Sequence, residues 1–403
     1  MKTVAIISEY NPFHSGHEYQ IKKIREEFGA DTRIVAIMSG NYTQRGEISI
    51  MDKSLRAECA VRCGVNLVLE LPFPFSSSSA EFFAKSGVRI LDSIGVIDYL
   101  SFGSESGSIS DLVKIAENMN TAEYKNLLND NLRAKTVRNI GYPELCERTY
   151  KELYGKPKIT SLSSPNNILA LEYIKALSDI NSRVIPHTVK RVGAGYSDNT
   201  IKEAEHQSAS AIRNLLSEDI DSAIKYIPQS AKNVIIENYN NKFPCESEKL
   251  ATAVISHFRI NSPTDVEFHD AGGGLYNRLK NASFEATTIS KLTELADTKK
   301  YTTARIRRAI WFSFFGVTSS EVKELPLYTQ VLAMDNVGKA ILKEVKKISC
   351  FPIVTKPSSY SFLSDSAKHQ KELSDKADAI FQLTKPNSVP GNLSLVTTPY
   401  IMN

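Results

Sequence analysis

The hydrophobic positions in the first part of the chain predict buried strands that alternate with amphipathic helices. Short apolar runs lie at residues 4–7, 34–38, 65–71 and 97–102, and a fifth strand is expected at residues 182–187. Runs that are short and apolar throughout are typical of strands covered on both faces, as in a parallel sheet. Segments between them place apolar residues at helical spacing instead. The pattern therefore predicts an α/β fold with a doubly wound parallel sheet.

Beyond Pro228 the pattern is mostly helical and contains no further apolar run of comparable length. A chain of 403 residues is long enough for two domains of roughly 100–200 residues each. We therefore expect residues 1–225 to form the α/β domain and residues 226–403 to form a mainly α-helical domain.

Composition narrows the class of protein only moderately. The chain is 42% hydrophobic and 23% charged, as in ordinary globular proteins. A net charge of +4 does not by itself indicate a nucleic-acid binder, so any basic surface must be local. No apolar run approaches the roughly 20 residues of a membrane span. The five cysteines have neither disulfide-framework nor zinc-site spacing, which predicts reduced thiols and a cytoplasmic protein.

The polar loop between the first strand and the first helix is the strongest candidate site. His14 and His17 lie three residues apart at the predicted helix start, so they face the same side. Gly16 lets a ligand approach the backbone closely, and the N–H groups of a first helical turn attract phosphate. Two such histidines could instead be a satisfied surface pair or half of a metal site. The strand before them and the amphipathic helix after them favour the phosphate site.

Other strand ends carry weaker candidates. A polar loop follows the second run and contains Arg45, and Lys53 and Arg56 lie just beyond it on a predicted helix. These three cations could contact phosphates or could be merely solvated. Gly103 directly follows the fourth strand, where a base or ribose could lie against the backbone. An ordinary turn is the alternative for Gly103.

A second group of candidates lies near residues 165–213. Asn167 stands at the start of a strongly apolar helix, where Asn commonly caps. Arg191 belongs to a basic, glycine-rich loop at residues 189–196 that follows the fifth strand. Ser210 and Arg213 open another helix and form a possible second phosphate cradle. Because serine caps many helices, this pattern alone is weak evidence for a phosphate site. Together with the histidine loop it is strong evidence.

The helical part contains one candidate for nucleic-acid binding, at residues 299–311. Thr302 or Thr303 can cap this helix. Its isoleucines are four residues apart and are expected to face the core, which leaves Arg305 and Arg308 largely outward. Arginine contacts phosphates with two hydrogen bonds and stacks on bases. A plain solvated helix is the alternative interpretation.

Taken together, these segments resemble the family of tRNA(Met) cytidine acetate ligases, within the His-x-Gly-His nucleotidyltransferase superfamily. The matching segments are residues 9–17, 38–40, 44–47, 102–105, 165–169, 190–196, 208–213 and 301–308, whereas the glycine-rich residues 271–275 match more loosely. The resemblance implies an enzyme that condenses acetate with ATP to acetyl-adenylate and pyrophosphate. It would then transfer the acetyl group to N4 of the wobble cytidine of elongator tRNA(Met), giving N4-acetylcytidine.

The resemblance also implies roles for individual residues. His14 and His17 would be catalytic, stabilising the α-phosphate and pyrophosphate, and Ser210 and Arg213 would hold the distal phosphates. ATP would be accompanied by Mg²⁺, and no other metal is expected. The macromolecular partner would be the anticodon stem-loop of the tRNA. Neither a membrane nor an obligate protein partner is expected. The implied ATP-binding residues are Ile7, Ser8, Glu9, Tyr10, Asn11, Pro12, Phe13, His14, Ser15, Gly16, His17, Gly103, Asn167, Arg191, Ser210 and Arg213. The implied tRNA-binding residues are Lys299, Lys300, Arg305, Arg307 and Arg308.

Two other functions remain open at this point. A small-molecule adenylyltransferase of the same superfamily would explain the histidines but would leave the basic helix without a role. A non-catalytic RNA-binding module would explain that helix but would make both phosphate cradles accidental. Salt-dependent affinity for tRNA separates the first from the ligase, and consumption of ATP separates the second.

Overall fold

The structure is a computed structural model of the chain. It describes residues 1–134, 141–159, 162–192, 207–261, 268–391 and 398–403. Within these ranges no helix combines the length and the apolar character that crossing a membrane requires.

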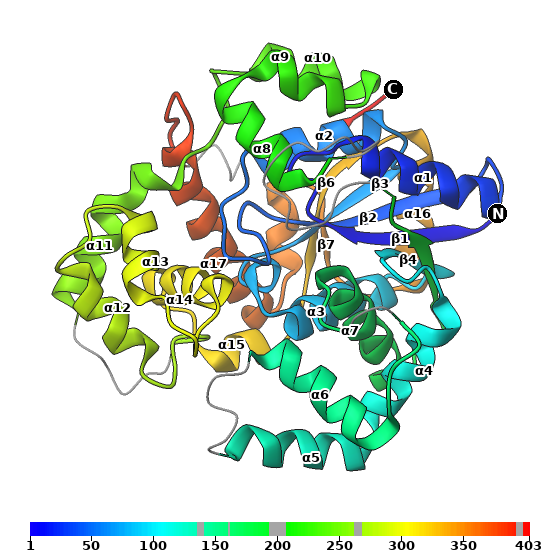
Figure 1. Cartoon of the computed structure of the whole chain (residues 1–403). Helices are drawn as coiled ribbons and strands as arrows, with labels where there is room; N and C mark the ends of the chain where they lie inside the picture. The colour runs from blue at the N-terminus through cyan, green and yellow to red at the C-terminus, as the bar shows by residue number, and fades with distance from the viewer. Residues whose placement is uncertain (135–140, 160–161, 193–206, 262–267, 392–397) are drawn as a thin grey trace.

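A single mostly parallel sheet organises the chain, with helices on both faces (Figure 1). The strands of the first half are β1 Thr3–Ser8, β2 Arg33–Ser39, β3 Leu67–Leu71, β4 Tyr99–Ser104 and β5 Ile185–Lys190. The sheet order is β5-β4-β1-β2-β3-β6-β7, so the chain runs outward from β1 to β3 and then returns to the other side of β1. This reversal places the topological switch point, where doubly wound sheets bind ligands, between the carboxyl ends of β1 and β4. The predicted doubly wound α/β fold is confirmed.

Alternate residues of each strand point into two separate hydrophobic cores. On β1, Val4 and Ile6 enter one core, whereas Ala5 and Ile7 enter the other. The helices of the first half are α1 Ser15–Phe28, α2 Lys53–Arg62, α3 Ala80–Ser93, α4 Ile109–Asn120, α5 Ala122–Arg133, α6 Tyr142–Tyr154, α7 Pro165–Asp179 and α8 Ala209–Glu218. Helices α3, α4 and α7 cover the second core, and α1 and α2 cover the first. Because both faces are covered, β1, β2 and β3 are mainly apolar, as their sequence indicates, whereas the edge strand β5 is more polar and partly exposed.

The second half of the chain is mainly helical. Its α-helices are α9 Ile220–Ala223, α10 Gln229–Asn238, α11 Ala251–Ile260, α12 Leu275–Ser283, α13 Ile289–Ala296, α14 Thr303–Phe315, α15 Ser319–Lys323, α16 Asn336–Ile348 and α17 Asp365–Phe381. Short 3-10 turns lie at Phe75–Ser77, Ile224–Tyr226, Ser247–Leu250, Pro357–Phe362 and Gln382–Thr384. Helices α11–α14 form a group beside the sheet, on the side away from the N-terminus (Figure 1).

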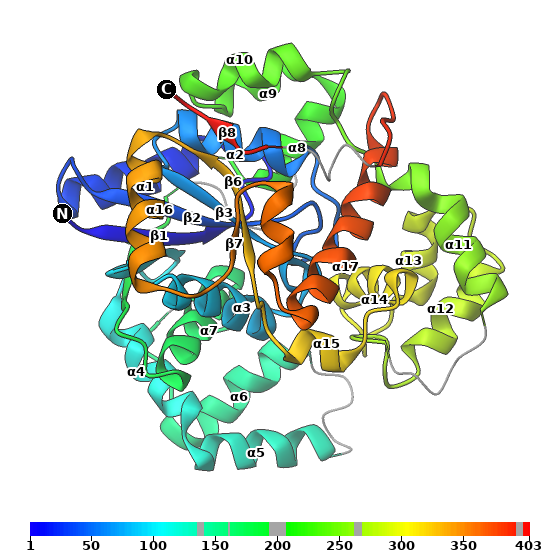
Figure 2. The same cartoon turned by 180° about the vertical axis from the view of Figure 1, so that it is seen from behind.

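Three strands of this half were not anticipated from the sequence. Strand β6 (Thr329–Met334) pairs antiparallel with β3, and β7 (Ile353–Val354) and β8 (Tyr400–Ile401) pair parallel with β6. Figure 2 shows these strands from behind, where they extend the sheet beyond β3, and it shows α16, which packs on the second core. Without β6, β3 would be an edge strand with unpaired outer N–H and C=O groups, although both of its faces are buried. The predicted division of the chain near residue 225 stays a prediction, but the sheet draws strands from both sides of it.

Candidate nucleotide site

The two histidines of the β1–α1 loop form the N-terminal cap of α1. His14 has an extended backbone (φ −141°, ψ 173°), and its Nδ1 accepts a hydrogen bond from the backbone N–H of Gly16 at 3.0 Å. His17 Nδ1 accepts from the backbone N–H of His14 at 3.2 Å, which completes a capping box built from two imidazoles. An Nδ1 that accepts a hydrogen bond carries no proton. Both rings are therefore neutral, and each places its N–H at Nε2.

The surroundings of His17 keep its imidazole neutral. Burial and, to a smaller extent, the positive charge of Arg191 together lower the pKa of His17 to about 3. The rings of Tyr10 and Phe13 supply part of this apolar environment, with centroids 4.9 and 5.4 Å from that of His17. A neutral imidazole donates a hydrogen bond to phosphate through Nε2–H without bringing a full charge.

This pKa leads to a measurable expectation. At pH 5.5 a histidine with an unperturbed pKa is about 90% protonated, whereas His17 is expected to remain neutral. Nitrogen NMR of the histidine side chains should show the Nε2–H tautomer of His17 unchanged between pH 8 and pH 5. A His17 midpoint near 6.5 would contradict the assignment.

The end of β4 completes the same cavity from the other side of the switch point. A cavity of 140 Å³ is lined by residues from the end of β1 to the first turn of α1 and by residues of other elements. They include Ser8, Glu9, Asn11, His14 and His17, together with Gln20, Gln44, Phe83, Gly103, Asn166, Tyr173, Arg191 and Ala209. A side chain at Gly103 would approach Arg191 Cγ to 3.2 Å, so glycine keeps this wall open. The structure thus brings Gly103, Arg191 and the histidine loop together, as the sequence predicts.

Asn167 does not act as the cap of α7. Ser164 occupies the N-cap position, and Asn167 lies one turn inside the helix and is fully buried. Its backbone N–H donates to the Glu105 carboxylate at 3.1 Å, and its Oδ1 accepts from the backbone N–H of Glu105 at 3.2 Å. Asn167 therefore ties α7 to the end of β4, and its neighbour Asn166 is the residue that lines the cavity. The apolar helix pattern alone gave no signal that distinguished these two asparagines.

Helix α8 brings the second predicted cradle to the histidine loop. Ser208 caps the helix. Arg213 donates to the backbone carbonyl of Asn11 at 3.0 Å, to Ser210 Oγ at 3.1 Å and to the Glu47 carboxylate at 3.1 Å. The Arg213 guanidinium therefore lies against the loop that carries His14, although about 200 residues separate them in the chain. The glycine-rich residues 193–196 of the preceding loop lie outside the described residues.

Lys53 is held in buried ion pairs, so it is not merely solvated, and a phosphate contact for it stays a prediction. Both predicted alternatives are wrong for Arg56. Arg56 is fully buried and donates to the backbone carbonyls of Glu9, Gly40 and Met51 at 2.5, 2.6 and 3.1 Å. Burial lowers its pKa to about 10, so the guanidinium is still charged at neutral pH. Arg56 thus fastens the loops after β1 and β2 to each other.

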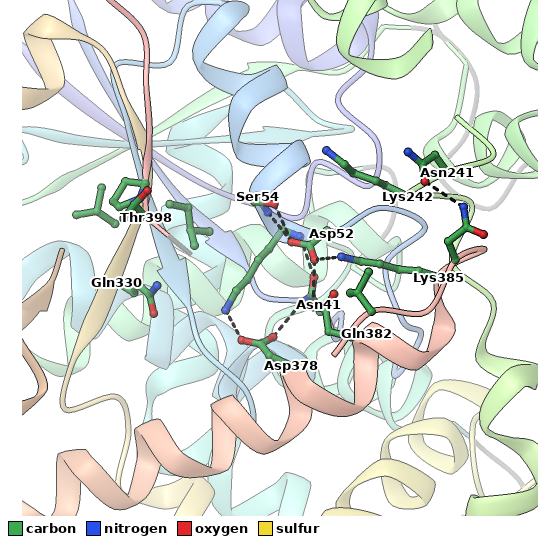
Figure 3. Close-up of a pocket in the computed structure, with 16 residues that line it drawn as sticks. Asn41, Asp52, Ser54, Asn241, Lys242, Gln330, Asp378, Gln382, Lys385 and Thr398 are labelled. Atoms are coloured by element: carbon green, nitrogen blue, oxygen red, sulfur yellow. Dashed lines mark hydrogen bonds and ion pairs between the residues drawn. The ribbon is translucent and has the colours of Figure 1, made fainter. Parts of the chain in front are cut away.

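Lys53 belongs to a buried ionic cluster beside a separate cavity of 410 Å³ (Figure 3). Its Nζ lies 2.6 Å from Glu70 on β3 and 2.5 Å from Asp378 on α17. Asp378 also accepts from Asn41 at 2.9 Å, and Asp52 pairs with Lys385 at 2.8 Å on the wall of the same cavity. The acidic and basic side chains of this wall neutralise one another, so the cluster serves to join α17 to the sheet.

The basic helix α14 differs from its predicted orientation. Thr302 caps the helix as predicted, but Arg308 is buried and pairs with Asp270 at 2.6 Å. Arg305 is half-buried and donates to the backbone carbonyls of Asp270 and Gly272. The expectation that both arginines face outward is wrong, because the glycine-rich loop before α12 folds over them. Lys299 and Lys300 are exposed, and Arg307 pairs with Glu47.

Comparisons with known proteins agree with this geometry. A doubly wound sheet with a His-x-Gly-His helix start at its switch point defines a nucleotidyltransferase of the HIGH class. The sequence model of that family, HIGH Nucleotidyl Transferase, matches residues 1–393.

Relatives narrow the class to one family. The tRNA(Met) cytidine acetate ligase of Thermoanaerobacter sp. (strain X514) is 35% identical over 404 residues, covering 98% of each chain. That of Clostridium novyi (strain NT) is 36% identical over 367 residues, covering 88% of this chain and 90% of the relative. This chain therefore belongs to the family of tRNA(Met) cytidine acetate ligases, and the resemblance seen in the sequence is confirmed.

Solved structures agree over the whole chain. Apo TmcAL of Thermotoga maritima (form I) superposes with a TM-score of 0.92 at 30% identity and covers 100% of both chains. The same protein bound with alpha-thio ATP (form II) superposes with a TM-score of 0.89 at 29% identity, covering 100% of this chain and 99% of that chain.

Proposed function

We propose that this protein activates acetate with ATP as acetyl-adenylate and transfers the acetyl group to N4 of the wobble cytidine of elongator tRNA(Met). The observation that carries the proposal is the paired Nε2–H donors of His14 and His17 at the switch point of the sheet, with Arg213 beside the same loop. Support also comes from full-length similarity to relatives of that name and to a neighbour that binds an ATP analogue.

In the first step, a carboxylate oxygen of acetate attacks the α-phosphorus of ATP and pyrophosphate leaves. This reaction mainly requires that the reactants be held in line and that developing charge be neutralised. We assign the imidazole Nε2–H groups to the α-phosphate oxygens and the Arg213 guanidinium to the distal phosphates. ATP would displace Glu47 and Ser210 from Arg213, since a phosphate offers a better bidentate acceptor.

Mg²⁺ is proposed to enter with ATP. Among the described residues there is no group of three or more His, Cys, Asp or Glu side chains arranged to hold a metal ion. This fits a Mg²⁺ ion held chiefly by phosphate oxygens and water rather than by a protein cage. Such an ion would neutralise phosphate charge while bound. The cytoplasmic location remains a prediction from the sequence.

The test uses labelled acetate with ATP and Mg²⁺, with and without bulk tRNA. Acetyl-adenylate is expected without tRNA, and label is expected to move into tRNA when it is added. Formation of N4-acetylcytidine is then checked by nucleoside analysis of the tRNA. If the protein makes no acetyl-adenylate but transfers AMP to a phosphorylated metabolite, the small-molecule adenylyltransferase replaces this proposal.

The tRNA is proposed to lie over the exposed basic residues that precede α14. Replacing Lys299 and Lys300 together by Ala is expected to weaken tRNA binding roughly tenfold and to lower the salt dependence of binding by roughly one to two counterions. Formation of acetyl-adenylate should change little, because both lysines lie outside the cavity that holds the histidines.

The matched control removes two other exposed lysines, Lys346 and Lys347, which lie at the end of α16. Helix α16 lies on the other side of the sheet from the α11–α14 group (Figure 2). Equal losses in the two double variants would show that only net charge matters and would contradict the proposed surface.

A further inference from the structure

We propose that Glu9 is the general base that takes the N4 proton of the cytidine during acetyl transfer. The inference deepens the proposed function and rests on it. Glu9 directly follows β1 and its side chain lines the cavity that contains His14 and His17. A carboxylate at this place is unexpected for a site that binds only the negative phosphates of ATP, because like charges repel.

One oxygen of the Glu9 carboxylate is held by a backbone hydrogen bond. Oε1 accepts the backbone N–H of Gln44 at 2.8 Å. Within the described part of the chain, Oε2 accepts no hydrogen bond, and the side chain is half-buried at the cavity wall. A base needs this combination, because the fixed oxygen orients the group and the second oxygen can reach a substrate proton.

The position of Gln44 shows which side of the cavity Glu9 serves. The backbone carbonyl of Gln44 accepts from Arg308 on α14 at 3.3 Å, and the indole N–H of Trp311 donates to the Gly46 carbonyl at 2.9 Å. Gly46 packs so closely on α14 that a side chain there would approach the Arg308 nitrogen to 2.5 Å. The loop that holds Glu9 is therefore fastened to α14, the helix directly after the two lysines that are proposed to hold the tRNA. The flipped cytidine is proposed to lie on this side of the cavity, beside Glu9.

The chemistry gives the base a defined task. The N4 nitrogen attacks the acetyl carbonyl carbon, a nitrogen–carbon bond forms, and the bond from that carbon to the phosphate oxygen breaks with its electron pair leaving on AMP. The attacking amine must lose one proton, and Oε2 of Glu9 accepts it before releasing it to solvent. The exocyclic amine of cytosine is a poor nucleophile because its lone pair is delocalised into the ring, so removal of this proton assists the attack.

The charge environment of Glu9 suits such a role. The pKa of Glu9 is raised, chiefly by burial and in part by the negative charge of Glu47. The hydrogen bond from the Gln44 N–H and the positive charges of Arg213 and Arg45 oppose this shift. A carboxyl whose pKa lies above its ordinary value is a stronger base than an exposed glutamate.

The test starts from purified acetyl-adenylate and tRNA, so that ATP activation is bypassed. Under single-turnover conditions, Glu9→Gln is expected to form N4-acetylcytidine on the order of 100-fold more slowly than the wild type. The glutamine Oε1 can still accept the Gln44 N–H, so the loop and the melting temperature should be maintained. The wild-type rate should rise with pH through the raised pKa of Glu9, and the variant should lack this rise. Glu9→Asp, which withdraws the carboxylate by one methylene, should give an intermediate rate.

Each outcome decides a separate point. A Glu9→Gln rate within twofold of the wild type overturns the inference and leaves the phosphate of the departing AMP as proton acceptor. A defect confined to formation of acetyl-adenylate from ATP also overturns it, because Glu9 would then act on nucleotide or Mg²⁺. If wild-type protein transfers no acetyl group from acetyl-adenylate to tRNA, the proposed function itself fails.

Discussion

Replacing His14 by Asn is expected to slow acetyl-adenylate formation by on the order of 10²–10³-fold, the usual effect of removing one donor to a developing anion. The substitution separates the two roles of this residue. The Asn side-chain oxygen is a good N-cap and can accept the N–H that His14 Nδ1 accepts now. It lacks a donor in the position of Nε2–H. Pyrophosphate release in the presence of acetate, ATP and Mg²⁺ measures the loss.

His14→Ala is the matched comparison for this prediction. It removes the cap as well as the donor and should also lower stability by about 1 kcal/mol. Thermal unfolding should therefore distinguish the two variants, whereas their adenylation rates should be similarly low. A His14→Asn protein that keeps more than a tenth of wild-type activity would show that Nε2–H does not serve the α-phosphate.

Replacing Lys53 by Met is expected to destabilise the fold by about 3–5 kcal/mol, the cost of breaking a buried ion pair from one side. Although burial alone lowers the pKa of Lys53, the carboxylates of Asp378 and Glu70 outweigh it and raise that pKa above its ordinary value. Without the ammonium group, the two carboxylates face each other inside the protein. Denaturant unfolding at pH 7 measures the loss.

The pH dependence provides the second measurement for Lys53→Met. Burial already raises the pKa of Glu70, with Asp378 adding to the effect and Lys53 opposing it. Removing Lys53 should raise the pKa of Glu70 further, so the deficit relative to wild type should shrink as the pH falls and the carboxyls take up protons. Adding Asp378→Asn should recover part of the loss at pH 7. Lys53→Met with wild-type stability would show that α17 does not depend on this cluster.

The sequence by itself determined the α/β class, the approximate positions of β1 to β4 and the position of the histidine loop, whereas β5 begins three residues later than the predicted strand at residues 182–187. The reason is that these features are local: a strand covered on both faces must be apolar throughout, and His14, Gly16 and His17 lie within one helical turn. The same local logic limited the cap of α14 to Thr302 or Thr303, and the structure shows that it is Thr302. The matching sequence segments, in their order along the chain, were also sufficient for the family resemblance.

The tertiary structure alone decided features that depend on contacts between distant segments. In the sequence, β6 is a short apolar run between helices. It becomes part of the sheet because it pairs with the outer edge of β3, a contact between segments far apart in the chain. Arg56, Lys53 and Arg308 have the polarity of surface residues, yet buried carbonyls and carboxylates from other elements surround them. Glu9 became a candidate base only when Gln44 and the histidines were seen around it. A charged side chain can be buried only where folding supplies its partners, and the identity of those partners is not encoded next to it in the chain.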